Sequence, residues 1–426
     1  MLARILFLTQ VLPYPPDAGP KVRQYHMLRY LAAQHEVALV SFVRSDDRPE
    51  AIRHLQGICA EVHTVPMRRS FWHNLWAGLK GLLTGRPMVI VRDEIGQMHA
   101  LLDRLTKQGT FEIIHADQLS MAWYGQWAAK RAPTAATLLD EHNAVYLLTK
   151  QLAARVADPV GRLIYDREAR AMANYEAAMC RAFDAVLTVT REDRDRLLAL
   201  FPARERAGLA SKFTVIPICV EPGELKLPVG QRPPAGRPTI LHLGTMFWPP
   251  NVAGVLWFAR EILPIIHKTL PNARFVIVGK SPPPEVLALT ADPRIEVTGY
   301  VEDPAPYVAA ADVFVVPLQV GEGMRVKILD AWSWSLPVVS TPVGAEGILV
   351  EPERNILLGA EAGDFAAQVM RVLTDSALNE ALRKAGRAWV EANYSWQNVY
   401  RRVDQVYAQL LTNRKAGLVD ERTTSR

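Results

Sequence analysis

The sequence lacks several features that would identify a class of protein at once. Its 426 residues contain three cysteines (Cys59, Cys180 and Cys219), which provide neither a disulfide framework nor a paired Cys-x-x-Cys metal site. The ten histidines form no His-Glu-x-x-His pattern, and no apolar run approaches the roughly 20 residues needed to span a bilayer. These absences disfavour a disulfide-rich secreted protein, a protein-built metal site and a transmembrane helix, and we expect a cytoplasmic protein.

The composition is that of a large folded protein. Apolar residues make up 49% of the chain and charged residues 22%, which excludes a mainly disordered or coiled-coil protein. The length exceeds what one hydrophobic core usually serves, so we expect two domains. Residues 1–218 hold 28 Lys and Arg against 22 Asp and Glu, whereas the remainder holds 21 against 22. The basic excess of the first half predicts contact with an anionic surface or substrate.

Short apolar runs alternate with longer amphipathic stretches along the whole chain. We expect strands at residues 5–8, 37–42, 61–65, 111–115, 136–139 and 185–189, and again at 239–243, 274–278, 295–297, 313–316 and 338–340. This β-α-β alternation predicts an α/β protein with two doubly wound parallel sheets. The opening apolar run is interpreted as a buried strand rather than a signal peptide, because Thr9 and Gln10 interrupt it and prolines follow.

The predicted domain boundaries follow from changes in local amino-acid composition along the chain. Prolines and glycines gather near residue 220, which indicates a linker between domains. We therefore predict an N-terminal domain at residues 1–218, a linker at 219–237 and a C-terminal domain at 238–392. A helix at 393–412 is predicted to cross back to the first domain, and a disordered polar tail follows at 413–426. Open parallel sheets bind ligands outside the carboxyl ends of their strands, so two such domains predict a site in a cleft between them.

One glycine-containing turn stands where such a site is expected. The strand at 313–316 is followed by Gly321, Glu322 and Gly323, and a helix is predicted to begin near Met324. Backbone N–H groups at a helix start suit a phosphate. Two cations in the first turn, Arg325 and Lys327, oppose the helix dipole unless an anion compensates them. The alternative is an ordinary solvated helix.

The segment 316–331 resembles the E-x7-E region of retaining glycosyltransferases of the GT-B fold, in particular glycosyltransferase family 4 (group 1). Further segments resemble that family in the same order, at 241–258, 276–279, 297–303 and 337–347. The resemblance implies two Rossmann-like domains that face a central cleft, with a nucleotide-sugar donor in the C-terminal domain. It further implies sugar transfer to a glycan or lipid-linked acceptor with retention of configuration, without a metal cofactor and without nucleic acid.

The resemblance also assigns roles in the donor domain. Glu322 would contact donor-sugar hydroxyls and Asp330 the ribose. The diphosphate and base would lie against Gly244, Thr245, Tyr300, Val301, Gly323, Met324, Arg325 and Lys327. Two departures stand out: the second acid is Asp rather than Glu, and Thr245 begins a segment where many relatives carry Arg and Lys. We expect Arg325 and Lys327 to supply the missing positive charge.

In the N-terminal half, polar residues follow the predicted strands. Gly19 lies in the loop after the first strand, which resembles the family's glycine-containing loop near the leaving phosphate. Where relatives often carry His-x-His, this chain has His115 and Asp117. Either of the two residues could make the contact with the reacting sugar, and both stay candidates. Candidates for acceptor or cleft contacts are Lys21, Arg23, His142 and Asn143.

Two further segments have competing interpretations. Residues 68–86 place aromatic and leucine side chains on one helical face, with basic and no acidic residues, which fits either docking on the inner face of an anionic membrane or packing within its own domain. The Asp193-Arg194-Asp195 pattern matches a metal motif of a different glycosyltransferase fold. We interpret it as structural, because Thr190 can cap the helix that begins there.

The function predicted from the sequence is therefore glycosyl transfer from a nucleoside diphosphate sugar. Two alternatives stay open: a nucleotide-sugar 2-epimerase of the same architecture, and a non-catalytic nucleotide-sugar-binding protein. An NAD-dependent dehydrogenase is disfavoured, because no Gly-x-Gly-x-x-Gly follows the first strand of either domain.

Overall fold

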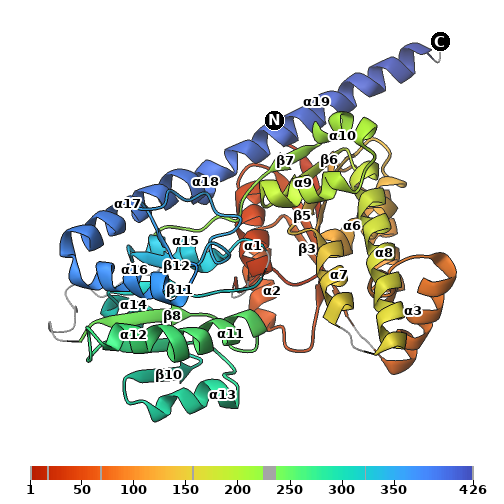
Figure 1. Cartoon of the computed structure of the whole chain (residues 1–426). Coiled ribbons are helices and arrows are strands. Elements are labelled where there is room, and N and C mark those ends of the chain that lie inside the picture. Colours follow the sequence, from red (N-terminus) through yellow and green to blue (C-terminus); the bar gives the residue numbers. More distant parts are fainter. Residues whose placement is uncertain are drawn as a thin grey trace. The chain divides into compact units, whose positions relative to one another are not determined.

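The computed structural model describes residues 2–16, 19–67, 70–155, 158–223, 237–321 and 323–424 (Figure 1). The chain divides into two compact units. Met1–Pro217 and Val399–Arg426 form the N-terminal unit, and Ile218–Asn398 forms the C-terminal unit. Most of the predicted linker lies outside the described residues, as does Glu322.

The N-terminal unit is built on seven parallel strands in the order β3-β2-β1-β4-β5-β6-β7. These strands are β1 (Arg4–Thr9), β2 (Glu36–Val43), β3 (Glu61–Pro66), β4 (Ile113–Asp117), β5 (Ala136–Glu141), β6 (Ala185–Thr188) and β7 (Phe213–Val215). The strand order reverses between β1 and β4, which is where doubly wound sheets bind their ligands.

Helices cover both sides of this sheet. They are α1 (Gly19–Ala32), α2 (Pro49–Gln56), α3 (Phe71–Thr84), α4 (Met88–Arg92), α5 (Gly96–Gln108), α6 (Leu119–Ala129), α7 (Val145–Arg155), α8 (Pro159–Ala182), α9 (Arg191–Ala199) and α10 (Ala203–Ala210). Helix α1 lies on one side of the strands, and α6 and α8 lie on the other (Figure 1). Because both faces are covered, the central strands are buried along nearly their whole length rather than at alternate residues.

The C-terminal unit repeats the same topology with six parallel strands in the order β10-β9-β8-β11-β12-β13. They are β8 (Thr239–Leu243), β9 (Arg274–Val278), β10 (Ile295–Gly299), β11 (Val313–Val316), β12 (Val338–Ser340) and β13 (Leu357–Leu358). Alternate residues of β11 enter two cores: Val313 and Val315 pack in the cluster that contains Phe258, whereas Phe314 and Val316 pack in the cluster that contains Trp332.

The helical segments of this unit are α11 (Pro249–Trp257), the π-helix η1 (Phe258–Ile262), α12 (Leu263–His267), α13 (Pro284–Leu287), the 3-10 helix η2 (Ala288–Ala291), α14 (Ala305–Ala310), α15 (Val326–Ser333), α16 (Ala362–Thr374), α17 (Ser376–Tyr394) and α18 (Trp396–Val399). Helix α15 begins at Val326, slightly later than the sequence predicted, with Arg325 at its N-cap.

The chain ends in one long helix, α19 (Arg401–Thr424), which belongs to the N-terminal unit. Its first turns are tied to that unit by a hydrogen bond from the Tyr30 hydroxyl to Asp404, 2.6 Å long. The predicted disordered tail at 413–426 is wrong for residues 413–424, because the helix continues to Thr424. No helix in the described part of the chain is long and apolar enough to cross a membrane.

The prediction of two doubly wound parallel sheets is confirmed by this topology. The sequence analysis missed two strands, β7 and β13, which have three and two residues. It also ended the strand of the first sheet at residue 115, whereas β4 continues to Asp117 and holds His115 in its middle. The predicted cleft between the domains stays a prediction.

Candidate active site

The topology defines one candidate edge in each unit. In doubly wound sheets, ligands bind beyond the carboxyl ends of the strands that flank the point where the strand order reverses. In the C-terminal unit these strands are β8 and β11, which Gly244 and the turn at 317–325 follow. In the N-terminal unit they are β1 and β4, and β4 ends at Asp117.

At the C-terminal edge, three elements converge on the Lys327 ammonium. Its Nζ donates a hydrogen bond to Asn251 Oδ1, 2.9 Å away, and Asn251 Nδ2 donates to the carbonyl of Thr245, also at 2.9 Å. A Cβ on Gly244 would lie 2.6 Å from Lys327 Nζ and 3.0 Å from Asn251 Nδ2. A side chain at 244 would therefore displace the Lys327 ammonium and the Asn251 amide from their positions beside the loop after β8.

The electrostatics of this cluster are unusual. Burial, and after it the neighbouring Arg325, lowers the pKa of Lys327 to about 7, while Asp330 acts in the opposite direction. Burial, and after it Lys327, also holds the pKa of His242 well below its usual range, so His242 is neutral. The partner of Lys327 is an amide, which does not neutralise a cation. An anion that entered here would meet the ammonium of Lys327, whose hydrogen bond goes to a neutral amide.

The turn before α15 places a second cation at the same helix start. Gly321 and Gly323 have φ values of 135° and 79°, which glycine tolerates and other residues rarely adopt. Arg325 Nη1 donates to the carbonyl of Gly323 at 2.6 Å, and a Cβ on Gly321 would lie 2.6 Å from Arg325 Nη2. Gly321 and Gly323 thus both lie close to the Arg325 side chain, at the positive end of the α15 dipole. Glu322 lies outside the described residues.

The other predicted donor contacts lie around this edge. Tyr300 follows β10 and exposes 74% of its surface, whereas Val301 and Met324 are partly buried against the core that contains Trp332. Asp330 lies on α15 three residues after Lys327. The predicted contacts of these residues with base and ribose stay predictions.

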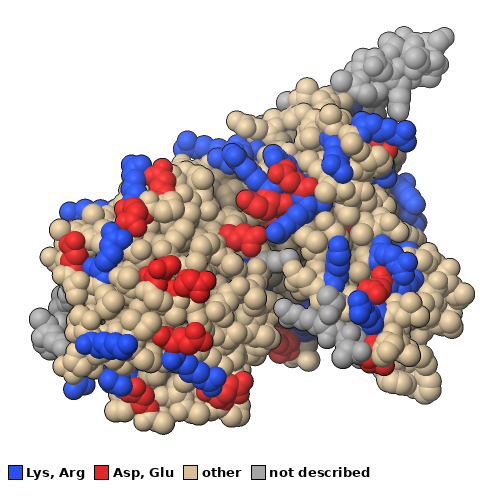
Figure 2. Space-filling model, in the orientation of Figure 1, with Lys and Arg blue, Asp and Glu red and all other residues tan. Residues whose placement is uncertain are grey.

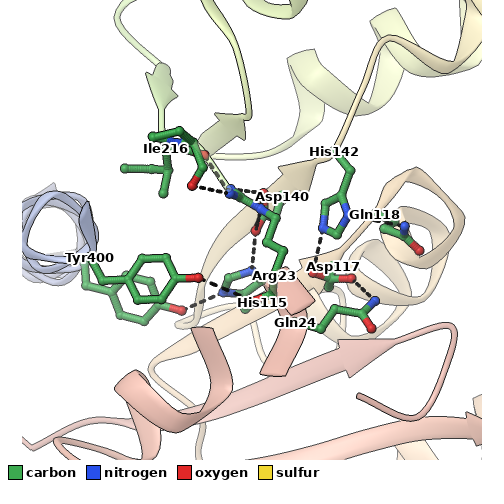
Figure 3. Close-up of polar contacts among 11 residues, drawn as sticks. Arg23, Gln24, His115, Asp117, Gln118, Asp140, His142, Ile216 and Tyr400 are labelled. Atoms are coloured by element: carbon green, nitrogen blue, oxygen red, sulfur yellow. Dashed lines mark hydrogen bonds and ion pairs between the residues drawn. The ribbon is translucent and has the colours of Figure 1, made fainter. Parts of the chain in front are cut away.

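The N-terminal edge is organised around a buried ion pair (Figure 3). Arg23, on α1, is fully buried and its guanidinium donates to both carboxylate oxygens of Asp140, with the shortest distance 2.7 Å. Its Nη1 also donates to the carbonyls of Ile216 and Pro217 at 2.6 and 3.2 Å. Burial alone would raise the pKa of Asp140, but the Arg23 and His115 side chains hold it well below the usual range.

This placement contradicts the prediction that Arg23 contacts the acceptor. Its guanidinium joins the ends of β5 and β7 from within the unit and has no exposed surface. Helix α1 begins at Gly19, and Lys21 lies in its first turn, so the proposed contacts of these two residues stay predictions.

His115 and Asp117 are both fully buried but belong to different hydrogen-bonding pairs. His115 Nδ1 lies 2.7 Å from the Tyr407 hydroxyl of α19. Asp117 accepts from Gln24 Nε2 and lies 3.0 Å from Nε2 of His142 (Figure 3). Gln118 Nε2 lies 3.3 Å from the other ring nitrogen of His142. Asp117 therefore orients His142, which is only partly buried, and Asn143 beside it is exposed.

One group of side chains has the spacing of a metal site. Ligand atoms of His115, Asp117 and Asp140 all lie within 4.8 Å of one another. However, both oxygens of Asp140 already bind the Arg23 guanidinium, and those of Asp117 bind Gln24 and His142. The position next to Asp140 that a cation would take is thus filled by arginine.

The two segments with competing interpretations are now placed. Thr190 caps α9 by accepting from the Asp193 backbone N–H at 2.9 Å, and Asp193 Oδ1 accepts from the Ala144 N–H at 3.4 Å. The predicted cap at Thr190, on which the structural interpretation of the Asp193-Arg194-Asp195 segment depends, is confirmed. Helix α3 exposes its large apolar side chains, including Trp72 at 75% and Trp76 at 61%, while Arg68 and Arg69 lie outside the described residues.

Sequence reasoning missed several residues of these edges. It gave no role to Gln24 or Tyr407. It named Asn251 only within the segment 241–258, and Asp140 only within a segment, residues 140–143, that resembles a cleft-lining part of the family. Asn251 lies in the first turn of α11, directly after the loop of Gly244, and a polar residue at such a position was a usable signal. The pairing of Asp140 with Arg23 had none, because 117 residues separate them.

Two family models match the sequence. A model described as glycosyl transferases group 1 matches residues 237–375, and a model described as a glycosyl transferase 4-like domain matches residues 18–209. Together they cover well over half of the chain, and each falls within one of the two structural units.

Curated relatives match over part of their length. CapM, a capsular polysaccharide biosynthesis glycosyltransferase of Staphylococcus aureus, is 29% identical over 131 residues, which are 30% of this chain and 34% of that protein. A UDP-Gal:alpha-D-GlcNAc-diphosphoundecaprenol alpha-1,3-galactosyltransferase of Escherichia coli is 29% identical over 180 residues, which are 39% of this chain and 44% of that protein. The matched stretches span less than half the length of these relatives.

Solved structures match over nearly the whole chain. The Anabaena protein Alr3699/HepE, in complex with UDP and glucose, superposes with a TM-score of 0.65 and 14% identity, and covers 95% of this chain and 99% of that chain. A likeness at this level of identity shows a shared fold.

Proposed function

Because the chain belongs to the group 1 glycosyl transferases and has their GT-B fold, we propose that it transfers a sugar from a nucleoside diphosphate sugar to an acceptor hydroxyl, with retention at the anomeric carbon. The observation that carries the proposal is the Lys327 cluster at the carboxyl edge of the second sheet. Its cation has a neutral amide partner and stands beside Arg325 at a helix start.

This cluster is suited to a departing diphosphate. When the bond between the anomeric carbon and the diphosphate oxygen breaks, negative charge develops on the diphosphate. Lys327, Arg325 and the first N–H groups of α15 would stabilise that charge, and in a site that excludes water such stabilisation is strong. A bond then forms between the anomeric carbon and the acceptor oxygen on the same face, and the hydroxyl proton leaves with the phosphate. Glu322 is assigned to orient the sugar.

The proposed reaction proceeds without a metal ion. The protein supplies two cationic side chains where other enzymes use a divalent metal to neutralise the leaving group. His115, Asp117 and Asp140 have the spacing of metal ligands, but Arg23 already pairs with Asp140, so we assign no metal ion to them in the proposed reaction.

We propose a membrane-linked acceptor, supported by two observations. The E. coli relative is named for a diphosphoundecaprenol substrate, which is a lipid. The N-terminal unit also exposes an apolar face formed by α3 and the first turns of α8, made up of Phe71, Trp72, Leu75, Trp76, Leu79, Leu82, Leu83, Val160, Leu163 and Ile164. The two helices are in contact, since Arg167 of α8 donates to the carbonyls of Gly81 and Arg86.

The charge around this apolar face favours an interfacial position. Helix α3 contains no acidic residue, and Figure 2 shows mostly uncharged surface at the right-hand rim, where α3 lies. Lys80 and Arg86 both pair with Glu94, so their charge is partly compensated. The tryptophans and leucines would therefore contribute more to binding than the basic residues, as in helices that lie in the bilayer interface.

Vesicle co-sedimentation tests the docking face. We expect the double variant Trp72→Ser with Trp76→Ser to bind vesicles of phosphatidylglycerol and phosphatidylcholine about tenfold more weakly, because two large apolar side chains no longer enter the interface. Trp248→Ser is the matched control, since Trp248 is also an exposed tryptophan but lies in the C-terminal unit. Equal binding of the double variant and the control would refute the docking face.

Donor turnover tests the catalytic proposal. The full chain is incubated with UDP-, GDP- and ADP-sugars, with and without undecaprenyl-diphosphate sugars in detergent, and released nucleotide is measured. We expect release from one donor that depends on the acceptor. Conversion of the donor to its 2-epimer would favour the epimerase, and tight nucleotide binding without turnover under any condition would favour a non-catalytic binding protein.

A further inference from the structure

A pocket of about 200 Å³ lies within the N-terminal unit, beyond the carboxyl ends of β1, β4 and β5. Its walls combine apolar side chains, among them Ile90, Leu119 and Met172, with the polar residues Ser120 and Glu141. Pockets for larger ligands usually have roughly 300–1,000 Å³, so this one has room for a single small ring.

Glu141 is the most unusual residue of this pocket. It ends β5, exposes 1% of its surface, and neither of its carboxyl oxygens has a hydrogen-bond partner among the described residues. Burial raises the pKa of Glu141 well above its usual range, and the carboxyl groups of Glu176, Asp140, Asp117 and Asp193 raise it further. This favours the neutral form of Glu141, and a neutral carboxyl can donate one hydrogen bond and accept others.

Ser120 presents a second buried polar group that lacks a hydrogen-bond partner. It lies in the first turn of α6, and its Oγ is buried without a hydrogen-bond partner among the described residues. Buried polar groups nearly always have a partner, so two that lack one in a single pocket require an explanation. A hydroxyl and a neutral carboxyl together can bind a ligand that both donates and accepts.

Two of the groups near Glu141 are already occupied, whereas the Tyr175 hydroxyl and Thr188 Oγ1 are, like Glu141, buried without a hydrogen-bond partner among the described residues. Glu176 accepts from the backbone N–H groups of Val145 and Tyr146 at 2.8 and 3.0 Å, and the two ring nitrogens of His142 face Asp117 and Gln118. Glu176 and His142 cannot satisfy Glu141 without losing a partner. Because Glu141 also lines the pocket, a ligand there could supply the missing hydrogen bonds.

We propose that this pocket binds one sugar ring of the acceptor, with adjacent ring hydroxyls hydrogen-bonded to the Glu141 carboxyl and the Ser120 hydroxyl. The apolar wall of Ile90, Leu119 and Met172 contacts the C–H face of the ring. The sugar assignment rests on the proposed function, because a glycosyltransferase acceptor carries such rings. A protonated amine is the alternative ligand, and the experiment separates the two.

The test is ligand-observed NMR titration of the full chain with glucose, galactose, mannose, rhamnose and N-acetylglucosamine, and with ethanolamine as the amine probe. We expect at least one sugar to bind the wild type. Glu141→Leu and Ser120→Ala should each weaken that binding about tenfold, because each leaves sugar hydroxyls unpaired. Glu141→Gln should bind within about threefold of wild type, since an amide both donates and accepts like a neutral carboxyl. Glu192→Leu, at an exposed position on α9, is the matched control.

Three outcomes would overturn the proposal: no sugar binds the wild type, the variants bind as the wild type does, or ethanolamine binds and Glu141→Gln abolishes it. Thermal unfolding checks the variants. Glu141→Leu should unfold at an equal or higher temperature than wild type, and if it does not fold, Ser120→Ala and Glu141→Gln still decide the outcome. Calorimetry with UDP, GDP and ADP on the same proteins separates the two proposals. Sugar binding without nucleotide binding rejects the donor site alone, and the reverse rejects this pocket alone.

Discussion

The two units place a cation at the same edge of the same fold but give it different partners. In the N-terminal unit, Arg23 is fully buried and pairs with the carboxylate of Asp140. In the C-terminal unit, Lys327 hydrogen-bonds the amide of Asn251, which leaves its charge uncompensated by that partner. A carboxylate partner makes the first cation structural. An amide partner keeps the second available for an anionic ligand, so the partner decides the role rather than the topology.

The largest expected effect comes from breaking the buried pair. Asp140→Asn keeps the shape of the side chain but removes the carboxylate that the buried Arg23 guanidinium binds, which should lower the unfolding free energy by about 3–5 kcal/mol. Urea denaturation followed by circular dichroism measures the change. Asp195→Asn is the control, because Asp195 pairs with Arg194 on the surface, where such pairs contribute about 0–1 kcal/mol. Equal destabilisation by the two substitutions would mean that Arg23 does not need its partner.

The second prediction removes the other cation. Lys327→Ala should weaken the binding of a nucleoside diphosphate about 10- to 100-fold, because hydrogen bonds to charged groups contribute about 1.5–3 kcal/mol. The unfolding temperature should stay equal or rise, since a desolvated ammonium is removed. Calorimetric titration with UDP and GDP measures the affinity, and Lys268→Ala, an exposed lysine of the same unit, is the control. A loss of stability without a loss of affinity would make Lys327 structural, like Arg23.

The third prediction converts one site into the other. Asn251→Asp gives Lys327 a carboxylate partner, as Asp140 does for Arg23. We expect nucleoside diphosphate affinity to fall about tenfold, because the new carboxylate neutralises the lysine and repels the diphosphate. The same titrations measure it, and Asn251→Ala separates loss of the amide from gain of the charge. If both variants bind equally well, the neutrality of the partner is irrelevant.

Much of the fold could be predicted from the sequence, because most strands of a parallel sheet that is covered on both faces contain nearly continuous apolar runs. The bounds predicted at 239–243, 274–278 and 313–316 are those of β8, β9 and β11. Strands β7 and β13 were missed, since three and two residues are too few to carry a pattern. The family and the GT-B fold, predicted from five short segments, are confirmed by the family models and by the solved structures.

The site was less predictable, because it depends on pairs that the sequence does not reveal. Arg23 and Lys327 both follow strands and both looked suited to an anion. The difference lies in Asp140 and Asn251, which are 117 and 76 residues away along the chain. The same limit applies to Glu141, whose raised pKa depends on its burial and on carboxyl groups contributed by several elements. The catalytic roles assigned to Glu322, His115 and Asp117 stay predictions.

The smallest effect, and the one that reports on Lys327 most directly, is the dependence of binding on pH. The pKa of Lys327 is lowered to about 7 in the free protein, and a bound diphosphate would raise it, so binding takes up a proton above pH 7. Affinity should therefore fall between pH 7 and 9. Without ligand the sign reverses: the unfolded chain binds more protons than the folded one from pH 7 to about 10, so stability due to this lysine rises with pH. Titrations in buffers of different ionisation enthalpy measure the proton uptake, which Lys327→Arg should abolish because arginine stays charged. Uptake that persists in Lys327→Arg would assign the proton to the ligand or to another group.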